Sequence, residues 1–127
     1  MQIKMHQILD FPNFYVLVKN QKITFKTSYR LAMLAAEVEK QYNFYTEQFR
    51  ALLNQYGQKD IEGNLIPTED GQGVKLVQET MEECYAKVNE LRDLDITLPD
   101  CYFSLDDFDG IELTPIEVNA IIPFIKM

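Results

Sequence analysis

The feature that most constrains this chain is a heptad repeat of apolar residues that continues for almost four heptads. One set recurs every seven residues and a second set follows it by four residues: Leu31, Val38, Tyr45 and Leu52, then Ala35, Tyr42, Phe49 and Tyr56. This spacing places all eight side chains on one face of a helix. Thr27 and Ser28 favour a helix start, and Gly57 favours its end. The pattern therefore predicts one long helix over residues 28–56.

A second, shorter apolar pattern predicts the helix that packs against the first. Its residues again recur every seven positions: Val74, Met81 and Val88, with Val77, Cys84 and Leu91 offset by three. This predicts a helix over residues 77–92, antiparallel to the first. Residues 57–76 are rich in glycine and predict a turn, or a small hairpin that pairs residues 64–66 with 74–76. Because the second helix is shorter, part of the long apolar face must meet the N-terminal segment, the C-terminal segment or another molecule.

Shorter elements are predicted on both sides of this helical hairpin. Residues 1–26 form an N-terminal segment with a strand at 1–5, a short helix within 7–19 and a strand within 21–26. Residues 93–127 form an acidic C-terminal segment with strands at 96–98 and 111–113 and a short helix from Pro115 to about Ile122, capped by Thr114. We expect one α+β domain over residues 1–127, predominantly helical, with a long antiparallel helical hairpin, short strands and small flanking helices.

Charge is distributed unevenly along the chain, whose net charge is −8. Residues 1–75 hold nine Lys/Arg and eight Asp/Glu, whereas residues 76–127 hold three and twelve. The acidic half disfavours direct binding to nucleic acid, because it repels phosphate groups. Two interpretations remain: the carboxylates keep the protein soluble, or they form an acidic face that binds a basic protein partner.

The residues offer no motif for catalysis or for a cofactor. His6 is the only histidine, and Cys84 and Cys101 lack the spacing of a zinc site, so we expect reduced thiols in a cytosolic setting. Two acidic loops, residues 60–64 and 106–112, lack the order of an EF-hand and are expected to be solvated turns or weak cation sites. Apolar stretches are too short for a membrane span. We therefore expect a protein without enzymatic activity, cofactor or bound metal.

The candidate partner-binding residues fall into two groups. The first is the aromatic set on the predicted long helix, which either packs in the core or anchors a partner, including a second copy along residues 28–56: Tyr42, Tyr45, Phe49 and Tyr56. The second is the acidic set of the C-terminal segment: Asp106, Asp107 and Asp109. Both groups point to binding of another protein.

Two short stretches carry a resemblance to a known family. They are Tyr56-Gly57-Gln58-Lys59-Asp60 with Gly63-Asn64, and Ile111-Glu112-Leu113-Thr114-Pro115-Ile116-Glu117 with Ala120 and Pro123-Phe124-Ile125. Together with the order of elements, they resemble a family of small phage and prophage proteins, of unknown function, from Gram-positive and gut bacteria. The resemblance implies a phage origin and a location in the bacterial cytoplasm or in the virion, and it supplies no catalytic residues.

These expectations lead to two functional hypotheses. The first is a non-enzymatic phage accessory protein that acts through protein–protein interaction, for example as a virion or tail assembly factor. The alternative is an acidic inhibitor of a host anti-phage defence system, an anti-CRISPR-like mimic of nucleic acid.

Overall fold

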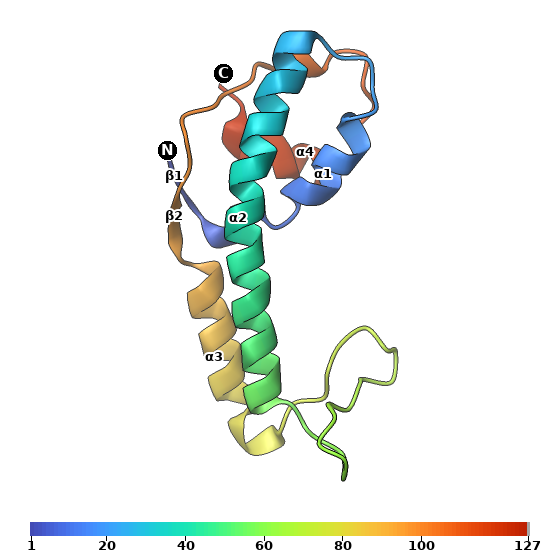
Figure 1. Cartoon of the computed structure of the whole chain (residues 1–127), viewed down its shortest axis with the longest axis vertical. Helices are drawn as coiled ribbons and strands as arrows, with labels where there is room; N and C mark the ends of the chain where they lie inside the picture. Colours follow the sequence, from blue (N-terminus) through green and yellow to red (C-terminus); the bar gives the residue numbers. More distant parts are fainter. Residues whose placement is uncertain (127) are drawn as a thin grey trace. The chain divides into compact units, whose positions relative to one another are not determined.

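The structure, a computed structural model, describes residues 1–126 and confirms a predominantly helical α+β fold. The main elements are β1 (Gln2–Lys4), α1 (Phe11–Val18), α2 (Phe25–Tyr56), α3 (Met81–Arg92), β2 (Asp95–Thr97) and α4 (Pro115–Ile121) (Figure 1). Short 3₁₀ helices lie at Met5–Ile8, Gln78–Thr80, Leu105–Phe108 and Ile122–Phe124. The chain divides into two compact units: unit 1 holds residues 1–43 and those from Leu94 onward, and unit 2 holds Phe44–Asp93. α2 contributes its first half to unit 1 and its second half to unit 2.

The long helix is present but begins at Phe25, three residues before the predicted start. Thr24 is the reason, because its hydroxyl oxygen accepts a hydrogen bond from the Thr27 backbone N–H (3.2 Å) and its hydroxyl lies 3.0 Å from that of Thr27. The predicted cap residue Thr27 is instead buried inside the helix. The strand predicted within residues 21–26 is wrong, since this stretch ends in the cap and the first residues of α2.

Unit 1 is closed by pairing between segments from opposite parts of the chain. β1 and β2 form an antiparallel pair with Ile3 opposite Ile96, which confirms the strands predicted near residues 1–5 and 96–98. Lys4 and Asp95 add an exposed ion pair of 2.7 Å. The strand predicted at residues 111–113 is absent, because the Ile111 N–H donates back to the Phe108 carbonyl and the chain turns there.

The inner face of α2 in unit 1 is buried by the N-terminal and C-terminal segments of the same chain. Thr27, Leu31, Leu34 and Val38 are at most 4% exposed. Leu34 takes the core position that the heptad pattern assigns to Ala35, which is half-buried. Apart from the first half of α2, unit 1 consists of these two segments, so they cover this part of the apolar face.

A continuous series of aromatic rings forms the centre of unit 1. Phe11 contacts Phe124 edge-on at 5.5 Å and Phe14 at 6.0 Å between ring centres. Phe14 contacts Phe108 at 5.7 Å, and Phe108 contacts Phe103 at 5.6 Å. Each such pair adds about 0.5–1.5 kcal/mol beyond its burial. The series joins α1 to the C-terminal segment, where α1 also packs against α4 (Figure 1).

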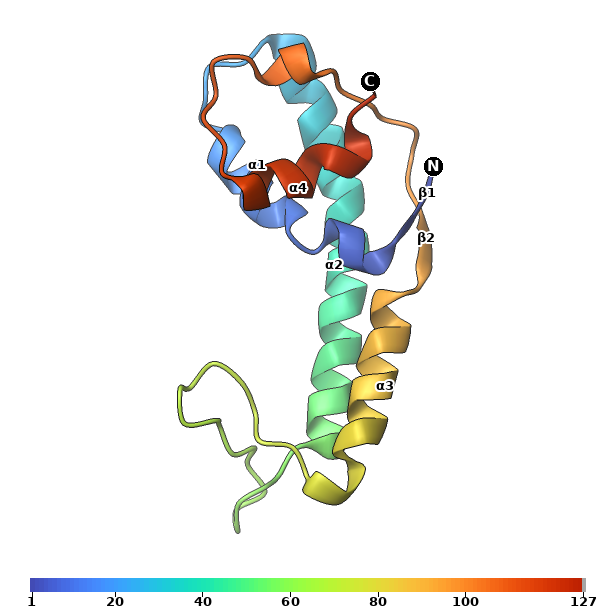
Figure 2. The ribbon, with the colours of Figure 1, turned by 180° about the vertical axis from the view of Figure 1, so that it is seen from behind.

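Unit 2 is a helical hairpin with a folded connection. α3 lies beside the second half of α2, as both views show (Figures 1 and 2). Tyr56 at the end of α2 and Cys84 on α3 are buried. Burial raises the pKa of the Tyr56 phenol, and the nearby Glu83 carboxylate raises it further, while the hydroxyl makes no hydrogen bond within residues 1–126. The two helices therefore share a small core at their connected ends.

The connection between the helices is paired with itself in three places. Bridges join Gly57 to Leu76, Lys59 to Leu65 and Pro67 to Val74. The Lys75 N–H donates to the Ile66 carbonyl at 2.8 Å, so the hairpin predicted between residues 64–66 and 74–76 is present only around Ile66 and Pro67. Leu65 pairs with Lys59 instead, and Leu76 pairs with Gly57. Gly57 is buried where these segments meet.

Gly57→Ala should destabilise unit 2, because the added Cβ would lie 2.5 Å from the Leu53 carbonyl oxygen and 2.6 Å from Leu65 Cδ2. Overpacking of this kind costs about 1–3 kcal/mol. The matched control is Gly73→Ala, whose Cβ would make only ordinary contacts at 3.8 Å with Thr68. The free energy of unfolding in urea, measured for both variants, checks this; an equal effect would contradict the tight packing at Gly57.

Tyr56→Phe should change the free energy of unfolding by no more than about 1 kcal/mol, because the buried hydroxyl makes no hydrogen bond within residues 1–126. Tyr56→Ala should cost about 3–5 kcal/mol, since it removes a buried ring. Urea unfolding followed by circular dichroism measures both. If the two substitutions cost the same, the hydroxyl rather than the ring would stabilise the hairpin.

Candidate interaction site

The structure uses the predicted aromatic residues to different extents in the fold. Tyr56 is buried in unit 2, and Tyr45 and Phe49 are half-buried there and stack on each other at 5.8 Å. Tyr42 is half-buried in unit 1 and lines a groove of about 440 Å³ between α1 and α2. None of these four residues is fully exposed, and Tyr56, at 4% exposed, has almost no surface to offer a partner.

The predicted acidic residues lie in or next to the 3₁₀ helix Leu105–Phe108. Asp107 is engaged locally, because its carboxylate accepts a hydrogen bond from the Ser104 backbone N–H at 2.9 Å. Asp106 and Asp109 are exposed. The same segment sends Phe103 and Phe108 into the core, so one side of it is structural and the other acidic.

A pocket of about 460 Å³ lies in unit 1 between α2 and residues 99–102. We call it the Met33 pocket; it is lined by Arg30, Met33, Leu34, Ala36, Glu37, Pro99, Asp100, Cys101 and Tyr102. The Cys101 thiol donates a weak hydrogen bond to the Arg30 backbone carbonyl across the pocket at 3.9 Å. The volume of the Met33 pocket falls within the range of pockets that hold ligands or side chains.

Large apolar side chains protrude from α2 next to this pocket. Phe25, Tyr29 and Met33 are 87%, 59% and 54% exposed, and their spacing of four residues places them along one side of the helix. We call these three residues the α2 surface stripe. Met33 belongs to both the stripe and the pocket, so an apolar ridge and an apolar hollow adjoin on one surface.

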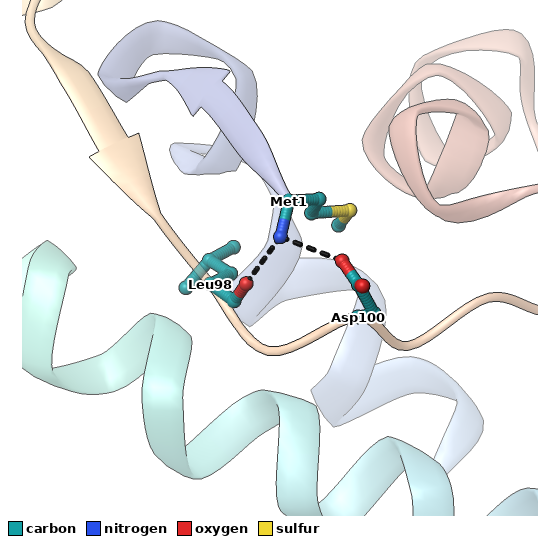
Figure 3. A network of polar contacts seen from close by, with 3 residues as sticks. All are labelled: Met1, Leu98 and Asp100. Atoms are coloured by element: carbon teal, nitrogen blue, oxygen red, sulfur yellow. Dashed lines mark hydrogen bonds and ion pairs between the residues drawn. The ribbon is translucent and has the colours of Figure 1, made fainter.

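The charged groups of the pocket differ in whether they are already paired. Asp100 accepts a hydrogen bond from the Met1 ammonium group at 2.7 Å, and the same group donates to the Leu98 carbonyl (Figure 3). Lys40 pairs with Glu37 at 3.0 Å. Arg30 makes no ion pair with any residue in the described part of the chain. Its charge partly offsets the effect of burial, which raises the pKa of the Cys101 thiol.

The remaining sequence candidates show no arrangement for chemistry. Within residues 1–126, no three His, Cys, Asp or Glu side chains gather as a metal site would require. In the 60–64 loop, the Asp60 carboxylate accepts hydrogen bonds from the Glu62 and Asn64 backbone N–H groups, as expected for a solvated turn. His6 is exposed, and both cysteines are free thiols. None of the described helices is both long enough and apolar enough to cross a bilayer.

Comparisons of the chain with protein-family models, with curated proteins and with solved structures find no significant match. Support for the candidate site therefore comes from its geometry alone.

The sequence reasoning overlooked both the stripe and the pocket. The signal for the stripe was present, since Phe25, Tyr29 and Met33 are spaced by four residues, but they fall outside the heptad positions that explained the helix. The pocket had no local signal, because it exists only where residues 99–102 approach α2.

Asp100→Asn should lower thermal stability at neutral pH, because the Met1 ammonium group donates to this carboxylate and attracts it, and so lowers its pKa. A carboxylate whose pKa falls on folding stabilises the folded state at pH values above its ordinary pKa of about 3.9. This stabilisation is lost as the pH falls through the lowered pKa. The difference in melting temperature between the two proteins should therefore be present at neutral pH and vanish in strong acid. The control is Asp109→Asn, which removes an exposed carboxylate; an equal loss there would contradict the assignment.

Proposed function

We propose that this protein is a non-enzymatic accessory protein of phage origin that binds another protein through the α2 surface stripe and the Met33 pocket. The exposure of the stripe is the observation that carries this proposal. Soluble chains tolerate single exposed apolar residues, but contiguous apolar surface marks sites of interaction. An aromatic residue, a methionine and an arginine on one surface match the composition of protein interfaces.

The type of contact favours an assembly role over inhibition by charge. An apolar ridge beside an apolar hollow suits a partner that stays bound, whereas an acidic mimic needs many free carboxylates in a defined array. Asp107 is held by the Ser104 N–H, which leaves Asp106 and Asp109 as the exposed carboxylates of that set. We therefore propose a virion or tail assembly factor in the bacterial cytoplasm or the particle, and we keep the acidic inhibitor of host defence as the alternative.

Replacing Tyr29 and Met33 together by Ala should weaken binding to the partner at least tenfold, since interface anchors of this kind often contribute more than about 1.4 kcal/mol. The tagged chain is purified from infected cells, and its partners are quantified by mass spectrometry. Ile116→Ala is the matched control, because Ile116 is 70% exposed, lies on α4 and does not line the Met33 pocket.

Equal recovery of every partner by the double variant and by wild type would refute the proposed surface. If instead binding is lost on changing Asp106 and Asp109 to Asn, and weakens as salt rises, the acidic inhibitor is the better proposal. Asp107 is left unchanged in that variant because it caps the backbone. Presence of the chain in purified particles, or in assembly intermediates, supports the assembly role.

A further inference from the structure

The two charged side chains of α2 that line the Met33 pocket lie on opposite sides of its centre. Arg30 and Glu37 are seven residues apart, with Met33 and Leu34 midway between them. Seven residues are about two helical turns and rise about 10 Å, so both side chains fall on the same side of the helix. The surface therefore has a positive end, an apolar middle and a negative end.

A surface with opposite charges at its two ends is complementary to a second copy of itself that is rotated by 180°. We propose that the Met33 pocket and the α2 surface stripe bind a second copy of this chain, with the two α2 helices antiparallel about a two-fold axis between Met33 and Leu34. This inference rests on the proposed function, because it names the partner of the same surface. A two-fold interface uses the same patch on both copies, so each favourable contact occurs twice.

The charges decide the direction of packing. In the antiparallel arrangement, Arg30 lies opposite Glu37 of the second copy, and Glu37 lies opposite Arg30 of the second copy. In a parallel arrangement with the same contact residues, each Arg30 would face Arg30 and each Glu37 would face Glu37. Like charges in contact across an interface disfavour that pairing strongly. Antiparallel packing alone gives two opposite-charge pairs.

The pairing state of each group supports a partner for Arg30 in particular. Asp100 is compensated by the Met1 ammonium group at 2.7 Å, so it does not repel a second copy as a bare carboxylate would. Glu37 contacts Lys40 at 3.0 Å, and a carboxylate has room to accept a second cation. Arg30 is the pocket-lining cation without an ion pair among the described residues, and Glu37 of the second copy supplies one.

The apolar part of the surface also matches its own reverse. The stripe supplies protruding side chains, Tyr29 and Met33, and the adjacent pocket supplies a hollow lined by Leu34, Ala36 and Pro99. After the two-fold rotation, Met33 of each copy lies opposite Leu34 of the other, at the hollow, and Tyr29 lies at the level of residue 38, just beyond it. The net charge of −8 opposes association, but the acidic excess belongs to residues 76–127, and of the pocket residues there only Asp100 is acidic, which is already paired.

We expect a reversible dimer that dissociates on dilution. Sedimentation equilibrium of the whole chain from about 1 μM to about 1 mM covers the dissociation constants of weak complexes. Wild type should shift from one to two chain masses across it. A monomer throughout overturns the inference.

Reversing either charge tests the geometry. Arg30→Glu and Glu37→Arg should each raise the dimer dissociation constant at least about tenfold, because each places two like-charge contacts in the dimer. An equimolar mixture of the two variants should dimerise again, since residue 30 of each then faces an opposite charge at residue 37 of the other. The control Glu112→Arg, which reverses an exposed charge outside the pocket, should dimerise like wild type. Circular dichroism checks that every variant is folded.

The outcomes separate this inference from the proposed function. A dimer that neither reversal weakens, or a mixture that stays monomeric although both variants are folded, overturns the antiparallel dimer. If a single reversal does not fold, Met33→Glu replaces it, and an unweakened dimer in that variant again overturns the inference. Should wild type be monomeric while the Tyr29 and Met33 double variant loses a different partner, the inference fails and the proposed function stands.

Discussion

Burial of one face of α2 is the constraint on which the rest of this structure depends. An isolated helix of this kind has too little stability of its own, because propensity alone barely offsets the cost of ordering the chain. Thr27, Leu31, Leu34 and Val38 reach near-complete burial only because the two terminal segments of unit 1 cover them. The ring series from Phe124 through Phe11 and Phe14 to Phe108 and Phe103 then joins those segments to each other.

The candidate site includes the apolar side chains of α2 that this burial leaves exposed. The inner face of α2 is used by the fold, and of its buried residues only Leu34 also lines the Met33 pocket. The other side of the helix carries Phe25, Tyr29 and Met33, which are more than half exposed. Arg30 and Glu37 flank Met33, so the surface around it has a positive charge at one end and a negative charge at the other. α2 therefore has two apolar faces, one buried by the fold and one exposed.

Much of the fold was predictable from local patterns, and the exceptions have identifiable causes. The heptad repeat located α2, Thr114-Pro115 located α4, and the turn-rich residues 57–76 predicted the connection in unit 2. Phe103 and Phe108 lie in the acidic C-terminal segment, with carboxylates between them, so no local pattern indicated their place in the core. The boundary at Phe25 depended on the Thr24 hydroxyl, and local patterns do not decide between Thr24 and Thr27 as the cap. The Met33 pocket required a tertiary approach that no local pattern encodes.

The pairing of distant segments in unit 1 has a consequence for the order of folding during synthesis. The Met1 ammonium group reaches the Leu98 carbonyl across 97 positions, and Phe11 needs Phe124. Unit 2, by contrast, is one continuous stretch of chain whose paired segments are close in sequence. Contacts between distant residues form more slowly than local ones. The hairpin can therefore form on the ribosome before unit 1 does. Residues 1–43 keep their phenylalanines uncovered until the residues from Leu94 onward have been synthesised.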